Sequence, residues 1–260
     1  MRTAKLLASL VVAMGAVGCL SIVEVSVETP IKPKLDASKF ARVYVAGFIA
    51  GGTEDVDTNL ETVRLLRSQL KNKSSLRVIE ADVQPLADLA VKAAGLAPGP
   101  AAPGTAPAAP GDAPRLAIRD ERDMLPYEKI FADKEYWKGV GEEYQGALIV
   151  TGSVIFVPYQ RSGYVQKEAE VYDSFGRRSV VPVRTYMDRK GFILKPKFLF
   201  IDGKTGETLY SETYREEILY NTEQSTPALS SYFELMDRLL PSFLSTLSSQ
   251  TIKGTRVLLR

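Results

Sequence analysis

The sequence predicts an α/β (α+β) fold: a mixed β-sheet with an N-terminal β-α-β unit, a central buried strand, an antiparallel meander and a C-terminal amphipathic helix. Three observations lead to this prediction. Residues 147–157 (ALIVTGSVIFV) are an unbroken apolar run, residues 42–81 alternate strand and helix patterns, and residues 226–247 carry the clearest helical periodicity in the chain. Together they indicate a sheet that is covered by helices.

The apolar run at residues 147–157 predicts a strand rather than a short buried helix. Six of its eleven residues are β-branched, Gly152 lies in its middle, and Pro158 follows it. β-Branched side chains favour strands, and a strand that is apolar on both faces is covered on both faces. We therefore expect this segment to be the central strand.

The N-terminal β-α-β unit is predicted from residues 42–49, the apolar face Leu60, Val63, Leu66 and Leu70, and residues 76–81. Thr58 and Glu61 have the spacing of a capping box. A phosphate-binding loop is disfavoured because Glu54, Asp55 and Asp57 would repel an anion at the helix start. A calcium loop is disfavoured because Leu60 and Leu66 replace its glycine and glutamate. The two strands of this unit should be parallel.

Residues 82–146 predict two helical segments separated by a disordered insertion. Residues 85–94 form the first, and residues 127–144 the second, with Trp137 in the core. Between them, residues 97–114 contain seven Ala, six Pro and three Gly, a composition that cannot form a core. An interdomain linker is the alternative, but each flank has too few strands to close a sheet.

The C-terminal half predicts a meander followed by a helix. We expect a turn at residues 159–164, a hairpin with one half-buried face at residues 165–187, a strand at 192–201 with Pro196 at a bulge or edge, and a returning strand at 208–218. Thr226 and Pro227 should begin the last helix, which Pro241 should kink or split. Residues 252–259 add a last strand.

The first eighteen residues have the pattern of a signal peptide. Arg2 and Lys5 precede twelve uncharged residues, a stretch too short to span a bilayer, and Cys19 is the only cysteine. Ala16-Val17-Gly18-Cys19 resembles the lipobox of bacterial lipoproteins, with Ala16 where Leu is usual. The resemblance implies cleavage before Cys19, which would carry diacylglycerol and an N-acyl chain such as palmitate.

Two other interpretations of this N-terminus are a plain signal peptide with a coincidental cysteine and an uncleaved anchor. In enterobacterial lipoproteins a residue such as Leu20 after the cysteine implies the outer membrane, on its periplasmic face. The predicted organisation is a signal peptide at 1–18, a lipidated tether at 19–39 with a short strand at 22–27, and a single α/β domain at 40–260.

Removal of the signal peptide leaves 31 basic and 31 acidic residues. A neutral chain without a nucleic-acid-binding motif does not predict binding to nucleic acid. The expected attachments are the membrane, through the lipid anchor, and an envelope protein partner, and this interpretation is compatible with an oligomer.

Three segments resemble a group of bacterial envelope proteins. Residues 141–154 (GEEYQGALIVTGSV), 198–212 (FLFIDGKTGETLYSE) and 43–48 are similar to the helix-strand passage, the hairpin and the first strand of this group. The group comprises the TolB amino-terminal domain, the curli-secretion lipoproteins and the lipoprotein activators of penicillin-binding proteins. The resemblance implies a regulator of an envelope complex for cell-wall synthesis, secretion or a Tol-like assembly.

The candidate contact surface lies in the meander, where residues 158–197 contain nine Lys or Arg and four Asp or Glu. Tyr and Arg are enriched at interface hot spots. The candidate partner-binding residues are Tyr159, Arg161, Tyr164, Arg177, Arg178, Arg184, Tyr186 and Arg189. The alternative is a solvated sheet face whose charges protect an edge.

An enzyme is not expected. The chain has no histidine, so it can form neither a Ser-His-Asp triad nor a histidine-ligated metal site, and we predict no catalytic residue, metal or cofactor other than the lipid on Cys19. The leading hypothesis is a lipid-anchored adaptor. One alternative is an oligomeric secretion or pore subunit, in which Lys167 would face lipid. The other is a glycan hydrolase that uses carboxylates among Glu168, Glu170, Glu212, Glu216 and Glu217.

Overall fold

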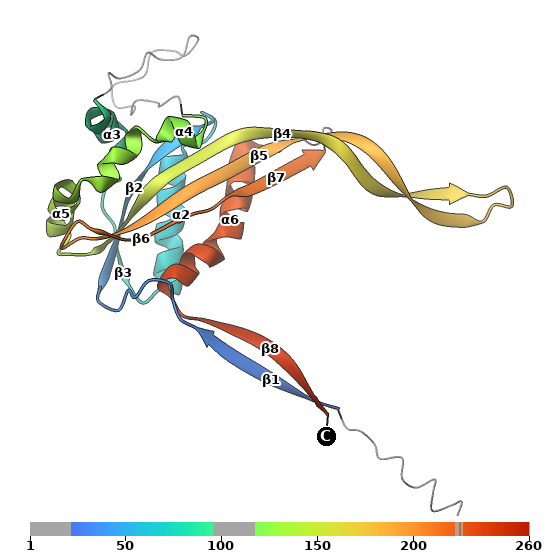
Figure 1. Cartoon of the computed structure of the whole chain (residues 1–260), viewed down its shortest axis with the longest axis horizontal. Coiled ribbons are helices and arrows are strands. Elements are labelled where there is room, and N and C mark those ends of the chain that lie inside the picture. Colours follow the sequence, from blue (N-terminus) through green and yellow to red (C-terminus); the bar gives the residue numbers. More distant parts are fainter. Residues whose placement is uncertain (1–21, 96–117, 222–223, 225, 260) are drawn as a thin grey trace, which may run out of the picture. The chain divides into compact units, whose positions relative to one another are not determined.

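The computed structural model describes residues 22–95, 118–221, 224 and 226–259 of the chain. They form two compact units, one spanning Lys34–Ser248 and one made from the two ends of the chain (Figure 1). The predicted signal peptide, Cys19 and the predicted insertion at 97–114 lie outside the described residues.

The larger unit is built on a six-stranded mixed sheet with the order β3-β2-β4-β5-β6, in which β7 also pairs with β5. Its strands are β2 (Arg42–Gly52), β3 (Arg77–Ile79), β4 (Leu148–Tyr172), β5 (Arg178–Asp202), β6 (Thr208–Thr213) and β7 (Glu216–Asn221). β2 is parallel to both β3 and β4, whereas β5 is antiparallel to β4, β6 and β7. The predicted fold class and the parallel β-α-β unit are confirmed.

Helices cover both faces of the central strand β4. Leu148, Val150, Val154 and Phe156 pack into the cluster that contains α2 (Thr58–Lys73) and α6 (Ala228–Leu247). Ile149 and Ile155 pack on the opposite face, against α3 (Leu86–Ala94), α4 (Glu121–Met124), the 3₁₀ helix η1 (Tyr127–Ala132) and α5 (Lys134–Glu143). Successive side chains of β4 point to opposite faces of the sheet and therefore contribute to two separate cores, as its apolar sequence predicts.

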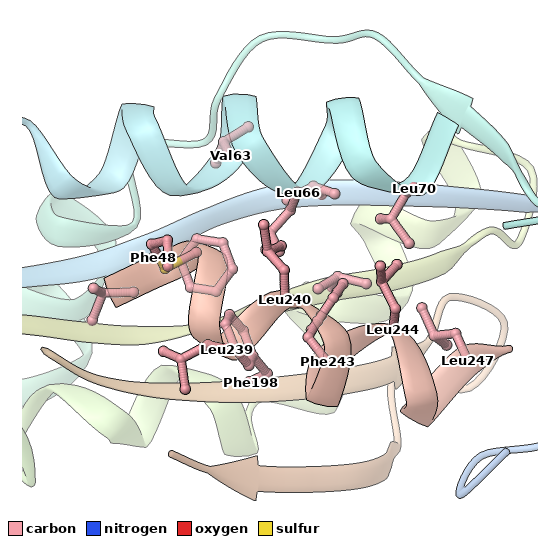
Figure 2. Close-up of a cluster of buried hydrophobic side chains, with 14 of the residues drawn as sticks. Phe48, Val63, Leu66, Leu70, Phe198, Leu239, Leu240, Phe243, Leu244 and Leu247 are labelled. Carbon is pink, nitrogen blue, oxygen red and sulfur yellow. The ribbon is translucent and has the colours of Figure 1, made fainter. Parts of the chain in front are cut away.

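The core between α2 and α6 contains the apolar residues that the sequence placed on each helix. Figure 2 shows Leu66 and Leu70 of α2 pointing toward α6, from which Leu240 and Leu244 point back. Phe243 stacks on Phe200 with a ring-centroid distance of 5.8 Å. On the other face of the sheet, Trp137 is fully buried and its indole N–H donates to the carbonyl of Ile130, so its predicted core role is confirmed.

The helix termini differ from the prediction in their capping residues. Asp57, not Thr58, caps α2, because its carboxylate accepts the Leu60 backbone N–H at 3.0 Å. Thr58 is instead the first residue of the helix and is buried. At α6 the N-cap is Pro227 rather than Thr226, and the helix continues through Pro241 without splitting.

Gly152 lies in the middle of β4 because a side chain would not fit there. Its φ of +147° is unfavourable for other residues, and a Cβ atom would lie 1.8 Å from the carbonyl oxygen of Lys197 on β5. This close approach is why a glycine interrupts an otherwise β-branched strand.

The predicted turn at residues 159–164 is wrong, because β4 passes through it and ends at Tyr172. The predicted return at 208–218 is two strands, β6 and β7. Pro196 of β5 lies between its two outer neighbours: β6 ends opposite Lys197, and β7 begins opposite Leu194. A proline is tolerated at such a gap because no outer strand needs its missing N–H.

The smaller unit is a two-stranded antiparallel sheet. β1 (Ile22–Ile31) pairs with β8 (Gln250–Leu259), from Ile22 opposite Leu259 to Ile31 opposite Gln250. The strand expected at 22–27 is therefore longer, and residues 250–259 pair with it instead of joining the large sheet.

Candidate interaction surface

The candidate surface is a hairpin that continues past the covered part of the sheet. β2 ends opposite Phe156, where the Thr53 N–H donates to the Phe156 carbonyl at 2.8 Å. β7 ends opposite Arg189. Beyond these points β4 and β5 pair only with each other among the described residues. We call residues 159–190 the long hairpin, of which only Arg189 and Lys190 still pair with β7 (Figure 1).

The predicted half-buried face is present only near the domain, where Gly163, Val165, Ala169 and Met187 are half-buried. Every residue from Glu170 to Tyr186 is exposed. The long hairpin contains eight of the thirteen large hydrophobic residues that are exposed in the described chain, including Tyr164 (75%) and Phe175 (82%). Exposed apolar residues gathered in this way mark interaction sites more often than scattered ones do.

The pairing register separates the side chains of the long hairpin into two faces. Residues directly opposite each other share a face, and successive residues alternate between faces. The tyrosine face contains Tyr164 opposite Tyr186, Gln166 opposite Arg184, and Tyr172 opposite Arg178. The valine face contains Val165, Lys167, Ala169, Val171, Val181, Val183, Thr185 and Met187, with Tyr159, Arg161 and Arg189 near the domain.

The candidate partner-binding residues do not form one patch. Tyr164, Arg178, Arg184 and Tyr186 lie on the tyrosine face. Tyr159, Arg161 and Arg189 lie on the valine face, and Arg177 belongs to the turn. Only Tyr159 and Arg189 among these eight residues are half-buried. The structure thus places four of the eight on one face, and it brings the rings of Tyr164 and Tyr186 into an edge-to-face contact with a centroid distance of 5.4 Å.

The charges of the two faces differ, a feature that the sequence prediction missed. The valine face carries Arg161, Lys167 and Arg189 and no acidic residue. The tyrosine face carries three basic residues and three acidic ones, Arg178, Arg184, Lys190, Glu168, Glu170 and Asp188. The excess positive charge of the long hairpin therefore lies on the valine face. The pairing register alone would have revealed this difference in charge, because the odd-numbered residues of both strands lie on the valine face and the even-numbered residues on the tyrosine face.

The turn at the tip is specified by Asp173. Its carboxylate accepts the backbone N–H groups of Phe175 and Arg177 and pairs with the Arg177 guanidinium at 2.8 Å. These bonds, first the one from the Arg177 backbone, lower the pKa of Asp173. Gly176 adopts a φ of +75°, and Arg177 lies 5.4 Å from the Phe175 ring centroid. Arg177 therefore stabilises the turn.

Glu212, one of the carboxylates considered for hydrolysis, lies in a hydrogen-bond network beside the sheet. It pairs with Lys34 and accepts bonds from the hydroxyls of Tyr214 (2.7 Å) and Tyr210 (3.1 Å). Partial burial would raise the pKa of Glu212, but these bonds outweigh it and lower the pKa. Burial and Glu212 both raise the pKa of Tyr214. The network joins the chain before β2 to β6.

Of the remaining candidate carboxylates, Glu168 and Glu170 are exposed and Glu216 and Glu217 are half-buried. Glu170 pairs with Arg178, and Glu217 lies 3.6 Å from Arg161. Within the described residues, no three Asp, Glu, His or Cys side chains gather in a way that could hold a metal ion.

A polar cleft of about 870 Å³ lies at the β3 edge of the sheet, away from the long hairpin. It is lined by residues of both charges, among them Arg64, Arg67, Lys71, Glu80, Asp82 and Tyr144. Arg67 donates to the Val45 carbonyl at 2.9 Å, its pKa is lowered by burial, and Lys71 pairs with Glu80. These basic groups are engaged with the protein itself.

None of the helices in the described part of the chain is long and apolar enough to cross a membrane. No protein-family model matches the chain. No curated protein sequence matches it significantly either.

Three solved structures resemble the chain at low identity. A PelC dodecamer from Paraburkholderia phytofirmans is 13% identical, with a TM-score of 0.36 over 88% of this chain and 100% of its own. Lipoprotein GNA1162 from Neisseria meningitidis is 10% identical (TM-score 0.33; 78% of this chain, 97% of that chain). A neuraminyllactose-binding hemagglutinin homolog from Helicobacter pylori is 10% identical (TM-score 0.34; 84% and 88%).

One of these three structures is described as a lipoprotein. Identities of 10–13% and TM-scores of 0.33–0.36 are too low to transfer a function or a site residue to this chain.

Proposed function

We propose that the protein is a lipid-anchored, non-catalytic adaptor that binds an envelope protein through the long hairpin. The observation that carries the proposal is the exposure of large apolar side chains on strands that no other described element covers: Tyr164, Tyr186, Phe175, Val171, Val181 and Val183. Without a partner, these apolar side chains remain in contact with water, and a partner that covers them would gain the free energy of burying them. Tyr and Arg supply contact area together with polar groups.

The anchor in this proposal is Cys19, with acyl chains that hold the protein at the periplasmic face of the outer membrane. Each buried CH₂ contributes about 0.8 kcal/mol, so two or more chains give stable attachment. The absence of histidine and the engagement of Glu212 with Lys34, Tyr210 and Tyr214 support a binding role over a catalytic one.

Photo-crosslinking in the native envelope tests this function. Tyr164 is replaced by benzoylphenylalanine, and the matched control carries the same group at Leu125, which is 63% exposed on the domain. We expect one discrete protein adduct from position 164 and none from position 125. Equal adducts from both positions, or none from position 164, would contradict the proposal. An adduct with twice the mass of the chain would point to self-association through the long hairpin instead.

A second test combines Tyr164→Ser and Tyr186→Ser in the full-length protein, with crosslinking in the native envelope and thermal unfolding measured after purification. We expect the thermal unfolding midpoint to stay unchanged because both side chains are exposed, while the adduct formed from a benzoylphenylalanine at Phe175 falls by about tenfold or more. An unchanged adduct yield would remove the tyrosine face from the contact.

A further inference from the structure

The long hairpin has two free edges, because beyond the domain none of the strands in the described part of the chain pairs with its outer sides. On β4 the free edge begins after Phe156, where pairing with β2 ends, and on β5 it lies before Arg189, where pairing with β7 begins. A free edge presents unpaired N–H and C=O groups that can bind another extended chain. Which edge is open depends on the proline positions.

The even-numbered residues of β4 direct their backbone N–H and C=O groups toward the free edge of β4, away from β5. The Phe156 carbonyl fixes the parity, since it accepts from Thr53 on the side away from β5. Pro158 and Pro182 fit the same rule, because Pro182 lies opposite Glu168 and a proline is tolerated where its nitrogen faces away from the partner strand. The free-edge groups of β4 thus belong to Gln160, Ser162, Tyr164, Gln166, Glu168, Glu170 and Tyr172.

Proline blocks one edge and leaves the other open. Pro182 interrupts the free edge of β5 near its centre, where an added strand would need an N–H donor. The edge of β4 contains no proline from Tyr159 to Tyr172. Only the β4 edge can therefore offer an uninterrupted set of backbone donors and acceptors to an incoming strand.

The side chains next to this edge define what the incoming strand should contain. On the valine face, β4 presents Val165, Ala169 and Val171 together with Arg161 and Lys167, and the opposite strand adds Arg189. A strand added to β4 extends this face and places its own side chains beside these residues. Apolar residues would match the valines, and acidic residues would match Lys167 and Arg189, since Arg161 already lies 3.6 Å from Glu217.

We propose that residues 159–172 bind an extended segment of the envelope partner as an added β-strand, and that this segment alternates apolar and acidic residues on the valine face. The inference rests on the proposed adaptor function and names how the partner is bound. Strand addition draws its affinity from main-chain hydrogen bonds and its specificity from alternate side chains.

A pair of proline variants at directly opposite positions tests the added strand. Gln166→Pro removes an N–H from the β4 edge, and Arg184→Pro removes one from the β5 edge. Both leave the pairing between the two strands intact, because both nitrogens face outward. In the full-length protein with benzoylphenylalanine at Tyr164, we expect Gln166→Pro to reduce the adduct by about tenfold or more. Arg184→Pro should leave at least about half, and Arg184→Gln controls for its charge.

Equal losses from the two proline variants, or no loss from Gln166→Pro in a protein with an unchanged unfolding midpoint, would overturn the added strand. Hydrogen exchange of the isolated complex gives a second measurement. Strand addition slows exchange at the even-numbered amides Ser162, Gln166 and Glu170 and leaves Val165 and Lys167 unchanged. Uniform slowing along β4 would overturn it.

The outcomes separate this inference from the proposed function. An adduct at Tyr164 that is insensitive to both prolines removes the added strand and retains the adaptor. Absence of any adduct in the parent protein removes both. An adduct that contains a second copy of the chain overturns the assignment of the edge to a partner segment.

Discussion

At the scale of single residues, the carboxylate of Glu212 holds two segments of the larger unit together. Glu212 accepts bonds from Tyr210 and Tyr214 and pairs with Lys34, so one carboxylate connects β6 to the chain that leads into β2. Because its pKa is lowered in the folded state, its contribution to the free energy of unfolding is present above its ordinary pKa of roughly 4.3. That contribution is lost as the pH falls through the folded-state pKa.

Glu212→Gln should therefore lower the free energy of unfolding by about 1–2 kcal/mol at pH 7, because charged acceptors bind more strongly than neutral ones. The difference from wild type should shrink below roughly pH 4, where the wild-type carboxyl is neutral too. Urea unfolding at both pH values measures it. Glu207→Gln, which breaks the exposed pair with Lys134, serves as the control and should cost less than Glu212→Gln, because solvent screens an exposed pair. A pH-independent difference would show that Glu212 contributes through packing.

Two glycines of β4 should respond oppositely to the same substitution. Gly152→Ala places a methyl group 1.8 Å from the Lys197 carbonyl at a φ of +147°, so it should destabilise the protein by more than about 3 kcal/mol. Gly163→Ala meets no atom within 4 Å and should stabilise the strand by about 0.5 kcal/mol. Thermal unfolding of the two variants makes the comparison, and equal effects would refute the close approach at Gly152.

At the scale of elements, the helices and strands that are held by core packing could be predicted from the sequence. The apolar run at Leu148–Phe156, the faces of α2 and α6 and the parallel β-α-β unit are all set by core packing, which leaves a periodic pattern. The length of β4 could not be predicted in this way. Between Tyr159 and Tyr164 the strand is uncovered, so no apolar alternation marks it and Ser162-Gly163 resembles a turn. The tip was predictable, since Asp173 and Gly176 specify it locally.

The candidate surface was predictable in composition and not in arrangement. A cluster of Tyr and Arg is visible in the sequence, but assignment to two faces needs the register that places Tyr164 opposite Tyr186. Arg177 and Arg178 show what composition cannot predict. The two neighbours look equivalent in the sequence, but Arg178 lies on the tyrosine face and pairs with Glu170, whereas Arg177 stabilises the turn through Asp173.

For the whole molecule, attachment to the membrane depends on one residue in our proposal. Cys19→Ser should leave the domain folded, because residues 34–248 form a compact unit of their own, and should move the protein from the membrane pellet to the soluble fraction. Fractionation with high salt and with detergent checks this, since only detergent releases a lipid-anchored protein. Retention of Cys19→Ser in the pellet would mean that another part of the chain holds the membrane.

The most direct test of the adaptor account replaces residues 162–188 with Asn-Gly, which joins the directly opposed residues Arg161 and Arg189 by a two-residue turn. Both cores remain, since none of their residues lies in the deleted segment. Because the deletion removes both photo-crosslinker positions, co-purification of the partner that the Tyr164 adduct identifies is measured without a photo-crosslinker in the chain. The thermal unfolding midpoint is measured on the same preparation. We predict an unchanged midpoint and complete loss of the partner. A shortened protein that keeps its partner would contradict the account.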